Sequence, residues 1–247
     1  MSDRLAVVTG AGGNIGAACA RLLRRVADVV LCVDRDEERV AATVSALGRQ
    51  GRMLVADATD AHFGTAIARS TALLGRAVAV VHAVAHEDHR SADELALSSL
   101  RQSLTVGPVA AFALFQQLKV TGCLARGAAL TVIGSLHARL PFPGVLGYNA
   151  AHAALGQVVK TLAHEWAGDG VRVNAVAPGW IRTGGEVVLY GEERLDQAAA
   201  GLPFRRFGTP EEVADAVGFL SSDAAAYISG STLTVDGALS VSMARLP

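Results

Sequence analysis

The sequence predicts one α/β domain, residues 1–247, in which helices cover both faces of a doubly wound parallel sheet. Short apolar runs alternate with helical segments along the chain, and the runs are almost continuously apolar, as strands buried on both faces require. A glycine-rich turn follows the first run and leads directly into a helix. The chain has 247 residues, of which 51% are hydrophobic, and this suits a single core.

The apolar runs predict the strands of the sheet. In chain order, they are Leu5–Thr9, Val29–Val33, Met53–Ala56, Ala77–Val81, Ala129–Ile133, Val171–Ala175 and Thr232–Val235. The crossovers between neighbouring parallel strands should be right-handed.

Helices are predicted between these strands. They cover about Ile15–Val26, Asp36–Leu47, a stretch that ends near Leu74, Ser91–Leu124, Gly147–Ala167 and a segment that begins at Pro210. We expect the fourth of them to break at Gly107-Pro108, because proline removes a helical hydrogen bond. Thr209 is the expected N-cap of the last one. The polar segment 184–206 interrupts the alternation, which predicts a substrate lid over a pocket.

Charge and composition exclude several classes of function. The formal net charge is -1, so no basic surface is available for nucleic acid or an anionic membrane. The first strand begins near residue 5, which leaves no room for a signal sequence. The uncharged run from residue 102 to 118 contains a proline, and predicts a buried or interfacial helix instead of a membrane span. The three cysteines, Cys19, Cys32 and Cys123, predict buried thiols in a cytoplasmic protein.

The turn after the first strand is typical of a dinucleotide-binding site. It reads Thr9-Gly10-Ala11-Gly12-Gly13-Asn14-Ile15-Gly16. Glycine permits the tight turn, lets the backbone approach a pyrophosphate and lets the helix pack closely on the strand. The free N–H groups at the helix N-terminus can then bind the phosphates.

An aspartate ends the second strand and favours NAD over NADP. The carboxylate of Asp34 can accept hydrogen bonds from both hydroxyls of the adenosine ribose, and it would repel a 2′-phosphate. Arg35 beside it could instead contact a 2′-phosphate. The alternative for Asp34 is an aspartate that caps a helix or lies on the surface.

Motifs in both halves of the chain carry a family resemblance. They are the turn Thr9–Gly16 and the segments Val171–Gly179, Arg206–Glu212 and Gly230–Gly237. These segments resemble the short-chain dehydrogenase/reductase family, whose turn reads Thr-Gly-x-x-x-Gly-x-Gly. Asn14 replaces the middle glycine, and because asparagine tolerates a positive φ, we expect the turn to be kept.

The resemblance implies a nicotinamide cofactor, expected to be NAD, and the residues that bind it. Asp57-Ala58 stand where the family contacts the adenine ring, Pro178-Gly179 lie by the nicotinamide, and Thr183 stands where the carboxamide is bound. The expected cofactor contacts are Gly10, Gly13, Asn14, Ile15, Gly16, Asp34, Arg35, Asp57, Ala58, Ala83, Pro178, Gly179, Ile181 and Thr183.

The resemblance also implies catalytic residues for hydride transfer. Tyr148 stands at the position of the acid–base tyrosine, and Ser135, 13 residues before it, at that of the serine that hydrogen-bonds the substrate oxygen. An unperturbed phenol titrates near ~10 and must be brought toward the working pH. The family uses a lysine four residues after the tyrosine for this purpose, but His152 occupies that position.

His152 is the expected substitute for the lysine, and the alternative is a residue that only fills the space of the lysine side chain. A spacing of four residues places Tyr148 and His152 on one helix face. Imidazole has a reference pKa of about 6.5 and is largely neutral at pH 7, so it should lower the pKa of the phenol less than lysine does, although it could relay a proton.

Two further family motifs are altered. The Asn-Asn-Ala-Gly that follows the fourth strand reads His82-Ala83-Val84-Ala85, and no asparagine lies between Leu95 and Tyr148. The family's relay asparagine, which holds a water next to the lysine, therefore has no counterpart.

Histidines gather where the pocket should form. They could build a proton relay, bind a metal, or simply shape the pocket as loop side chains. We favour the last interpretation and assign no metal site, because the segment has no fixed helical face. The residues concerned are His82, His86, His89 and His137.

We therefore expect an NAD(H)-dependent oxidoreductase that interconverts a secondary alcohol and a ketone, with Tyr148 as acid–base. The alternative is a protein of the same fold without redox activity: a lyase, an isomerase, a hydrolase, or a binding or regulatory subunit. The joint loss of the lysine, the relay asparagine and Asn-Asn-Ala-Gly favours that alternative. The helices at about Ser103–Leu124 and Gly147–Ala167 are rich in small and apolar residues. The resembled family uses them in subunit interfaces, so we expect a homo-oligomer, either a tetramer or a dimer.

Overall fold

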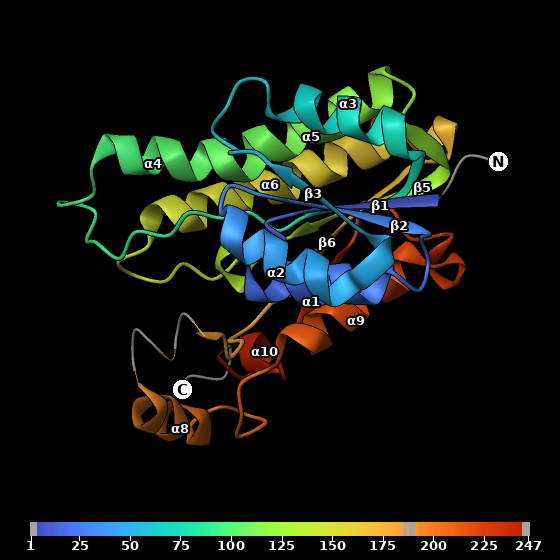
Figure 1. Ribbon diagram of the computed structural model, residues 1–247. Helices are drawn as coiled ribbons and strands as arrows, with labels where there is room; N and C mark the ends of the chain where they lie inside the picture. The colour runs from blue at the N-terminus through green and yellow to red at the C-terminus, as the bar shows by residue number, and fades with distance from the viewer. Residues whose placement is uncertain (1–3, 185–186, 188–190, 244–247) are drawn as a thin grey trace.

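The computed structural model describes residues 4–184, 187 and 191–243. Within these residues, seven parallel strands form one sheet in the order β3-β2-β1-β4-β5-β6-β7 (Figure 1). Each predicted strand overlaps an observed one, and the predicted doubly wound sheet is confirmed. The strands are β1 (Arg4–Thr9), β2 (Val29–Asp34), β3 (Gly51–Val55), β4 (Arg76–His82), β5 (Leu124–Ile133), β6 (Arg172–Pro178) and β7 (Thr232–Val235).

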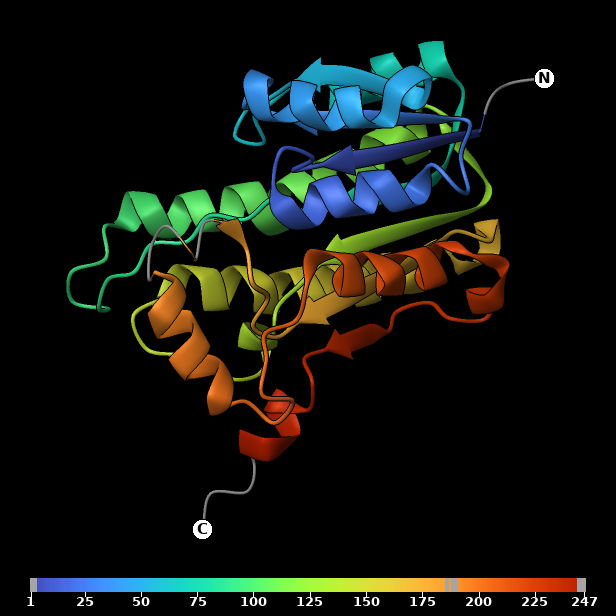
Figure 2. The same cartoon turned by 60° about the horizontal axis from the view of Figure 1, so that its bottom comes forward.

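Helices cover both faces of the sheet (Figures 1 and 2). One face carries α3 (Phe63–Leu74), α4 (Leu97–Leu104), α5 (Ala110–Val120) and α6 (Leu146–Glu165). The other face carries α1 (Asn14–Leu23), α2 (Glu37–Leu47) and α9 (Pro210–Ser221). Two helices lie apart from these layers, α8 (Glu192–Ala200) and α10 (Leu239–Met243). Short 3₁₀ turns are η1 (Gly48–Gln50), η3 (Leu136–Ala138), η4 (Ala167–Asp169) and η5 (Asp223–Ala225).

The sequence of β1 shows why both faces need a cover. Leu5 and Val7 belong to the core under α3 and α5, whereas Ala6 and Val8 belong to the core under α1 and α9. All four side chains are fully buried. Since side chains alternate between the faces of a strand, a continuously apolar strand supplies both cores at once.

The long helical segment before β5 is not broken at Gly107-Pro108, contrary to the sequence-based expectation. The helix passes through a π-helical turn, η2 (Thr105–Val109), and continues as α5. In a regular α-helix, the ring of Pro108 would collide with the carbonyl four residues earlier. The wider π turn relieves that collision, so the direction of the helix is kept.

A buried histidine joins three elements at the crevice of the sheet. The strand order reverses between β1 and β4, and open α/β sheets bind ligands outside the carboxyl ends of the strands at such a point. His82 ends β4 and is fully buried. Its Nε2 lies 2.9 Å from the carbonyl oxygen of Val106 in η2, and its Nδ1 lies 2.9 Å from the hydroxyl of Thr9 in β1. A carbonyl only accepts, so Nε2 carries the proton and Nδ1 accepts from Thr9.

His82 is therefore not a loop side chain that shapes the pocket, and this part of the sequence interpretation was wrong. The strand extends one residue further than the apolar run suggested, because the two hydrogen bonds satisfy a polar side chain that would otherwise be costly to bury.

The last long helix begins as the sequence predicts. The hydroxyl of Thr209 accepts from the backbone N–H of Glu212, and the carboxylate of Glu212 accepts from the backbone N–H of Thr209. Pro210 occupies the first position of α9, where its missing N–H costs nothing. The guanidinium of Arg206 also pairs with Glu212 and, as the main cause, lowers the pKa of that carboxyl to about 2.

The segment predicted as a lid contains α8. Leu195 of α8 packs against Leu136, Leu202 and Phe207 in a small separate core. Arg182, which follows β6, forms ion pairs with Glu192 and Asp196 of α8. Residues 185, 186 and 188–190 of the predicted lid lie outside the described residues.

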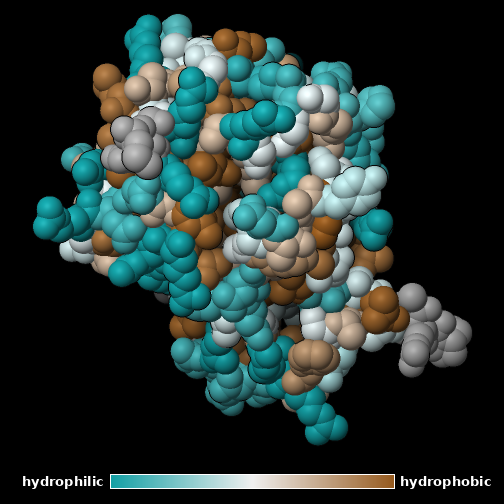
Figure 3. Space-filling model, turned by 90° about the vertical axis from the view of Figure 1, so that its right-hand side faces the viewer, coloured by the Kyte–Doolittle hydropathy of each residue, from teal (hydrophilic) through white to brown (hydrophobic). Residues whose placement is uncertain are grey.

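Other expectations concern the surface and the thiols. No helix in the described part of the chain is both long and apolar enough to span a bilayer. Hydrophilic side chains predominate on the face seen in Figure 3, with apolar ones between them. All three cysteines are buried, as predicted, and burial raises the pKa of the Cys19 and Cys32 thiols to about 12.

His82 predicts a loss of stability in mild acid. Burial lowers its pKa to about 4, from an ordinary value of 6.5. Between these values the unfolded chain binds a proton that the folded chain does not, so the free energy of unfolding falls as the pH falls. Between about pH 7 and 4.5, the free energy of unfolding of His82→Asn should therefore fall by about 1–3 kcal/mol less than that of the wild type. Urea unfolding at the two pH values measures the difference.

His62 provides the matched control, because it is exposed on the surface. His62→Asn should show the same loss of unfolding free energy in acid as the wild type. An unchanged loss in His82→Asn would contradict the assignment of a neutral, buried imidazole to position 82.

Candidate active site

The turn between β1 and α1 keeps its backbone close to β4. Gly10 has a φ of 72°, and a Cβ there would collide with the carbonyl oxygen of Ala83. A Cβ on Gly16 would collide with the carbonyl oxygen of Gly10. Gly13 precedes α1, and no side chain caps the helix, so the first N–H groups of α1 have no partner from a capping side chain. Backbone of this shape fits the pyrophosphate of a dinucleotide.

Asn14 preserves the turn for a reason other than the one the sequence suggested. It is the first residue of α1 and is not among the non-glycine residues with a positive φ. The backbone at this position is helical, so a side chain is accepted without strain. Tolerance of a left-handed conformation is not needed there.

A cavity of about 170 Å³, which we name the β2 cavity, opens beyond the ends of β1, β2 and β3. Asp34 stands on its wall, where Oδ2 accepts from the backbone N–H of Gly12 (2.9 Å) and Oδ1 from that of Asp36 (3.1 Å). These bonds fix the carboxylate at the edge of the glycine turn. The predicted cofactor residues that line this cavity are Gly10, Gly13, Asp34, Arg35, Asp57, Ala58 and Ala83.

Two arginines share the β2 cavity with Asp34. Arg35 and Arg39 both line it. Arg35 lies 3.9 Å from the carboxylate of Asp57, and both side chains are largely exposed. The backbone N–H of Thr59, more than Arg35, lowers the pKa of Asp57. The cavity therefore presents carboxylates and guanidinium groups together.

A second cavity of about 330 Å³, the β6 cavity, lies on the other side of the glycine turn. The predicted cofactor residues on its wall are Ile15, Pro178, Gly179, Ile181 and Thr183. Ser135 and Tyr148 line the same cavity. The structure thus brings the predicted catalytic hydroxyls to the predicted nicotinamide site.

A third cavity of about 430 Å³, the outer cavity, adjoins these hydroxyls. Ser135 and Tyr148 line it as well, and much of the remaining wall is apolar. α8 contributes Arg194, Leu195 and Ala198 to its wall. The other apolar side chains on the wall are Leu136, Phe142, Pro143, Val145, Pro178, Trp180 and Phe207.

Ser135 and Tyr148 are held by different elements. Ser135 follows β5, is almost fully buried and accepts a hydrogen bond from the backbone N–H of His137 (3.2 Å). Tyr148 lies in the first turn of α6, one helical turn before His152. The ring centroids of Tyr148 and His152 are 4.1 Å apart, with the ring planes inclined by 56°. The predicted contact between these two side chains is present.

His152 is buried and electrically neutral over most of the pH range. Only 5% of it is exposed, and Nδ1 has no hydrogen-bond partner among the described residues. Burial, with smaller contributions from His137 and His82, lowers its pKa to about 4. A small space of about 10 Å³ beside the ring is lined by Tyr148 and Ser103. His152 therefore fills the position of the lysine without supplying its positive charge.

The remaining histidines do not form a metal site. Both ring nitrogens of His82 are already bonded within the protein, so it cannot be a ligand. His86 bonds the hydroxyl of Ser99 (3.1 Å), and His89 lies 3.3 Å from the carboxylate of Glu87. The described residues contain no group of three or more His, Cys, Asp or Glu side chains that could hold a metal ion.

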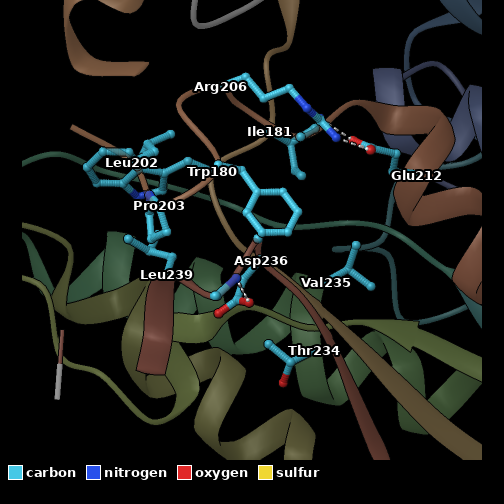
Figure 4. Close-up of a pocket in the computed structure, with 14 residues that line it drawn as sticks. Trp180, Ile181, Leu202, Pro203, Arg206, Glu212, Thr234, Val235, Asp236 and Leu239 are labelled. Carbon is cyan, nitrogen blue, oxygen red and sulfur yellow. Dashed lines mark hydrogen bonds and ion pairs between the residues drawn. The ribbon is translucent and has the colours of Figure 1, made fainter. Parts of the chain in front are cut away.

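A further cavity of about 340 Å³ lies between the segment that follows α8 and the end of β7 (Figure 4). Trp180, Leu202 and Asp236 line it, and the Arg206–Glu212 ion pair lies on one side. None of the three predicted catalytic residues is on its wall. We therefore place the candidate site at the β6 and outer cavities instead.

Several residues of the site were not predicted from the sequence. Glu87 lines both the β6 and the outer cavity, and it lies in the histidine-rich segment that drew attention for other reasons. Asn149 and Trp180 directly follow Tyr148 and Gly179, so proximity in the sequence was the signal that could have found them. Phe142 gave no such signal.

Comparisons with known proteins agree with the motifs. A family model described as enoyl-(acyl carrier protein) reductase matches residues 10–240. Galactitol 2-dehydrogenase (L-tagatose-forming) of Cereibacter sphaeroides is 34% identical to this chain, and the match covers 96% of this chain and 94% of the relative. Cis-4-hydroxycyclohexanecarboxylate dehydrogenase of Sinomonas cyclohexanicum is 34% identical, with 96% of each chain covered.

A solved structure from Beutenbergia cavernae is similar along the whole fold. It is described as a candidate NAD(P)-dependent gluconate 5-dehydrogenase with NADP bound at low occupancy. The two chains are 35% identical, the match covers 98% of each, and the TM-score is 0.86. Sequence similarity, sheet order and the glycine turn lead to one conclusion: the chain belongs to the short-chain dehydrogenase/reductase family.

Proposed function

We propose that the protein is an NAD(H)-dependent oxidoreductase that interconverts a secondary alcohol and a ketone. One observation carries the proposal. Ser135 and Tyr148 line both the β6 cavity and the outer cavity. Two hydroxyl groups shared by a cofactor-sized and a substrate-sized space are what hydride transfer to or from a carbinol carbon requires.

The residues of the β2 and β6 cavities fit a dinucleotide. The glycine turn leaves no room for a Cβ at Gly10 and Gly16, and a pyrophosphate needs this close backbone. Asp34, at the end of β2, is placed to accept hydrogen bonds from ribose hydroxyls. Thr183 and Ile181 would hold the carboxamide end. When bound, the nicotinamide supplies or accepts the hydride.

The protein's own residues would then handle the proton. Tyr148 donates a proton to the ketone oxygen, or removes one from the alcohol, and Ser135 donates a hydrogen bond to the same oxygen. The largely apolar wall of the outer cavity excludes water around these groups, which strengthens the hydrogen bonds. The neutral ring of His152 packs against Tyr148, so we assign it the role of positioning that phenol.

The names of the relatives support this reaction class. The galactitol and cis-4-hydroxycyclohexanecarboxylate enzymes are named as dehydrogenases of alcohols.

We further propose that segment 184–206 is a substrate lid on a single catalytic domain, and that the protein is cytoplasmic. Buried thiols and the packing of α8 beside Leu136 support these assignments.

A second candidate is a protein of this family without redox activity. The observation that favours it is the pKa of His152, which burial lowers to about 4, so the cation beside the tyrosine is lost. Acid–base work by Tyr148 would remain available for a lyase or hydrolase. The two candidates differ in whether the protein binds a nicotinamide cofactor.

Asp34 predicts a preference between the cofactors. We expect NADH to bind at least about tenfold more tightly than NADPH, because a 2′-phosphate would lie against a carboxylate. Asp34→Ser should reduce or reverse that preference, since Arg35 and Arg39 line the same cavity. Calorimetric titration of the two cofactors measures it.

Asp36→Ser is the matched control, because Asp36 is also close to the turn but caps α2. It should keep the preference of the wild type. Tighter binding of NADPH by the wild type would overturn the assignment of NAD, and the absence of binding for both cofactors would favour the non-redox candidate.

Because His152 is neutral and does not favour the ionised form of Tyr148, we expect kcat/KM to rise at alkaline pH. A cation beside the phenol favours the ionised form, so His152→Lys should move the rise of kcat/KM to a lower pH by about one unit or more. The small space beside the ring gives room for the longer side chain. The pH–rate profile of alcohol oxidation checks the shift.

His152→Gln removes the imidazole without adding a charge, and it should keep the position of the wild-type profile. If both variants lose most of the activity, the imidazole has an essential role of its own, and the positioning role is wrong.

The exposed face of the long helices predicts self-association. Val109, Phe112 and Leu146 are large apolar residues that are 41–56% exposed. We propose that this face forms the interface of a homo-oligomer, as in a dimer or tetramer. Phe112→Glu should lower the mass measured by light scattering at micromolar concentration, because a carboxylate would be buried there. Leu73→Glu, on the exposed side of α3, should leave the mass unchanged, and a monomeric wild type would refute the interface.

A further inference from the structure

His137 lies next to both proposed catalytic hydroxyls. It sits in the turn η3, two residues after Ser135. Its ring stacks on Phe142 with centroids 4.3 Å apart, and meets the ring of Tyr148 edge-on at 5.1 Å. The two aromatic contacts and one hydrogen bond hold the imidazole in a single orientation.

That hydrogen bond fixes the tautomer of the ring. Nδ1 of His137 lies 2.9 Å from Oδ1 of Asn149, and Nδ2 of Asn149 donates to the carbonyl oxygen of Phe142 at 2.9 Å. Reversing the amide would place its oxygen against that carbonyl, where neither group can donate. Oδ1 must therefore accept, so Nδ1 of His137 carries the proton.

The opposite nitrogen, Nε2, is consequently a bare acceptor. Burial is the main reason that the pKa of His137 lies below its ordinary value, so the ring is neutral at neutral pH and Nε2 keeps its lone pair. Among the described residues, Nε2 of His137 has no hydrogen-bond partner. It is also not one of the buried polar atoms that lack a partner, so it is accessible. His137 lines the outer cavity, and its Nδ1 edge is covered by Asn149, so the open edge is the one with Nε2.

The two rings packed against this imidazole supply one donor between them, the hydroxyl of Tyr148. The two rings that contact the imidazole are those of Phe142 and Tyr148. Phe142 has no polar group, and the hydroxyl of Tyr148 is assigned to the reacting oxygen. A bound substrate displaces water from Nε2. If the substrate offers no donor in place of that water, the lost hydrogen bond costs binding free energy.

We propose that Nε2 of His137 accepts a hydrogen bond from a second hydroxyl of the substrate, next to the carbon that is oxidised. The substrate class is then vicinal diols and polyols, or the corresponding hydroxyketones. This inference rests on the redox function proposed above. His137 is a specificity residue: it selects the alcohol, while Tyr148 and Ser135 act on the oxygen that reacts.

The test compares 2,3-butanediol with 2-butanol, which have the same carbon skeleton. With NAD⁺, we expect the wild type to prefer the diol in kcat/KM by about 30-fold or more, since unpaired polar groups in a site discriminate strongly. His137→Phe keeps a flat ring on Phe142 but lacks the acceptor, so the preference should fall below about threefold.

His89→Phe is the matched control. His89 also lines the outer cavity, but its ring faces Glu87, so the variant should keep the wild-type preference. His137→Gln retains a side-chain acceptor and should restore part of the preference that His137→Phe loses. Thermal unfolding of each variant verifies that it is folded.

Nitrogen NMR of the histidine rings tests the same inference without turnover. We expect His137 to show a protonated Nδ1 and an unprotonated Nε2, and the Nε2 resonance to move on addition of 2,3-butanediol but not of 2-butanol. A protonated Nε2, equal rates for the two alcohols in the wild type, or an intact preference in His137→Phe would each overturn the inference. If no alcohol is oxidised, the redox proposal fails, while the NMR response still decides whether the second hydroxyl is bound.

Discussion

The two hydrogen bonds of His82 determine the shape of the region on which the proposed chemistry depends. They connect β1, β4 and the π turn of the long helix at the point where the strand order reverses. The glycine turn approaches the chain just beyond this histidine, at Ala83. Burial lowers the pKa of His82 to about 4, so at neutral pH Nδ1 carries no proton and accepts from Thr9 while Nε2 donates to Val106. The crevice is therefore built on a neutral histidine.

Like His82, the histidines beside the proposed catalytic groups are uncharged at neutral pH. Burial lowers the pKa of His82 and of His152 to about 4, and it also lowers that of His137. Two of these uncharged imidazoles, those of His137 and His152, contact the ring of Tyr148, and His152 stands where the family resemblance implies a lysine. The three rings make different contacts. His82 joins the strands, His152 packs against the phenol, and His137 offers an acceptor to the outer cavity.

The sequence was sufficient for the sheet, since a continuously apolar strand can only be buried on both faces. It was also sufficient for Thr209 and Pro210, because capping depends on residues within one turn. The predicted helix break at Pro108 was wrong, because the packing of the segments that follow decides whether a proline breaks a helix or widens one turn. The meeting of Ser135 and Tyr148 was implied by family spacing, and the structure brings them to the same two cavities.

Contacts between distant residues set what the sequence could not predict. The strand end at His82 depends on the carbonyl of Val106, 24 residues away. The tautomer of His137 depends on an amide that is itself oriented by the carbonyl of Phe142. Neither arrangement leaves a periodic pattern, so composition and spacing suggested only that histidines gather near the pocket.

Transfer of a deuterium label from the reduced cofactor tests whether the protein moves a hydride between the nicotinamide and a ketone. NADH that carries deuterium at both positions of C4 is mixed with a ketone, and the alcohol product is analysed by mass spectrometry. We expect the label on the carbinol carbon, and we expect Tyr148→Phe to slow the transfer by at least about 100-fold. Absence of label from the product, or a Tyr148→Phe variant as fast as the wild type, would contradict the proposed reaction.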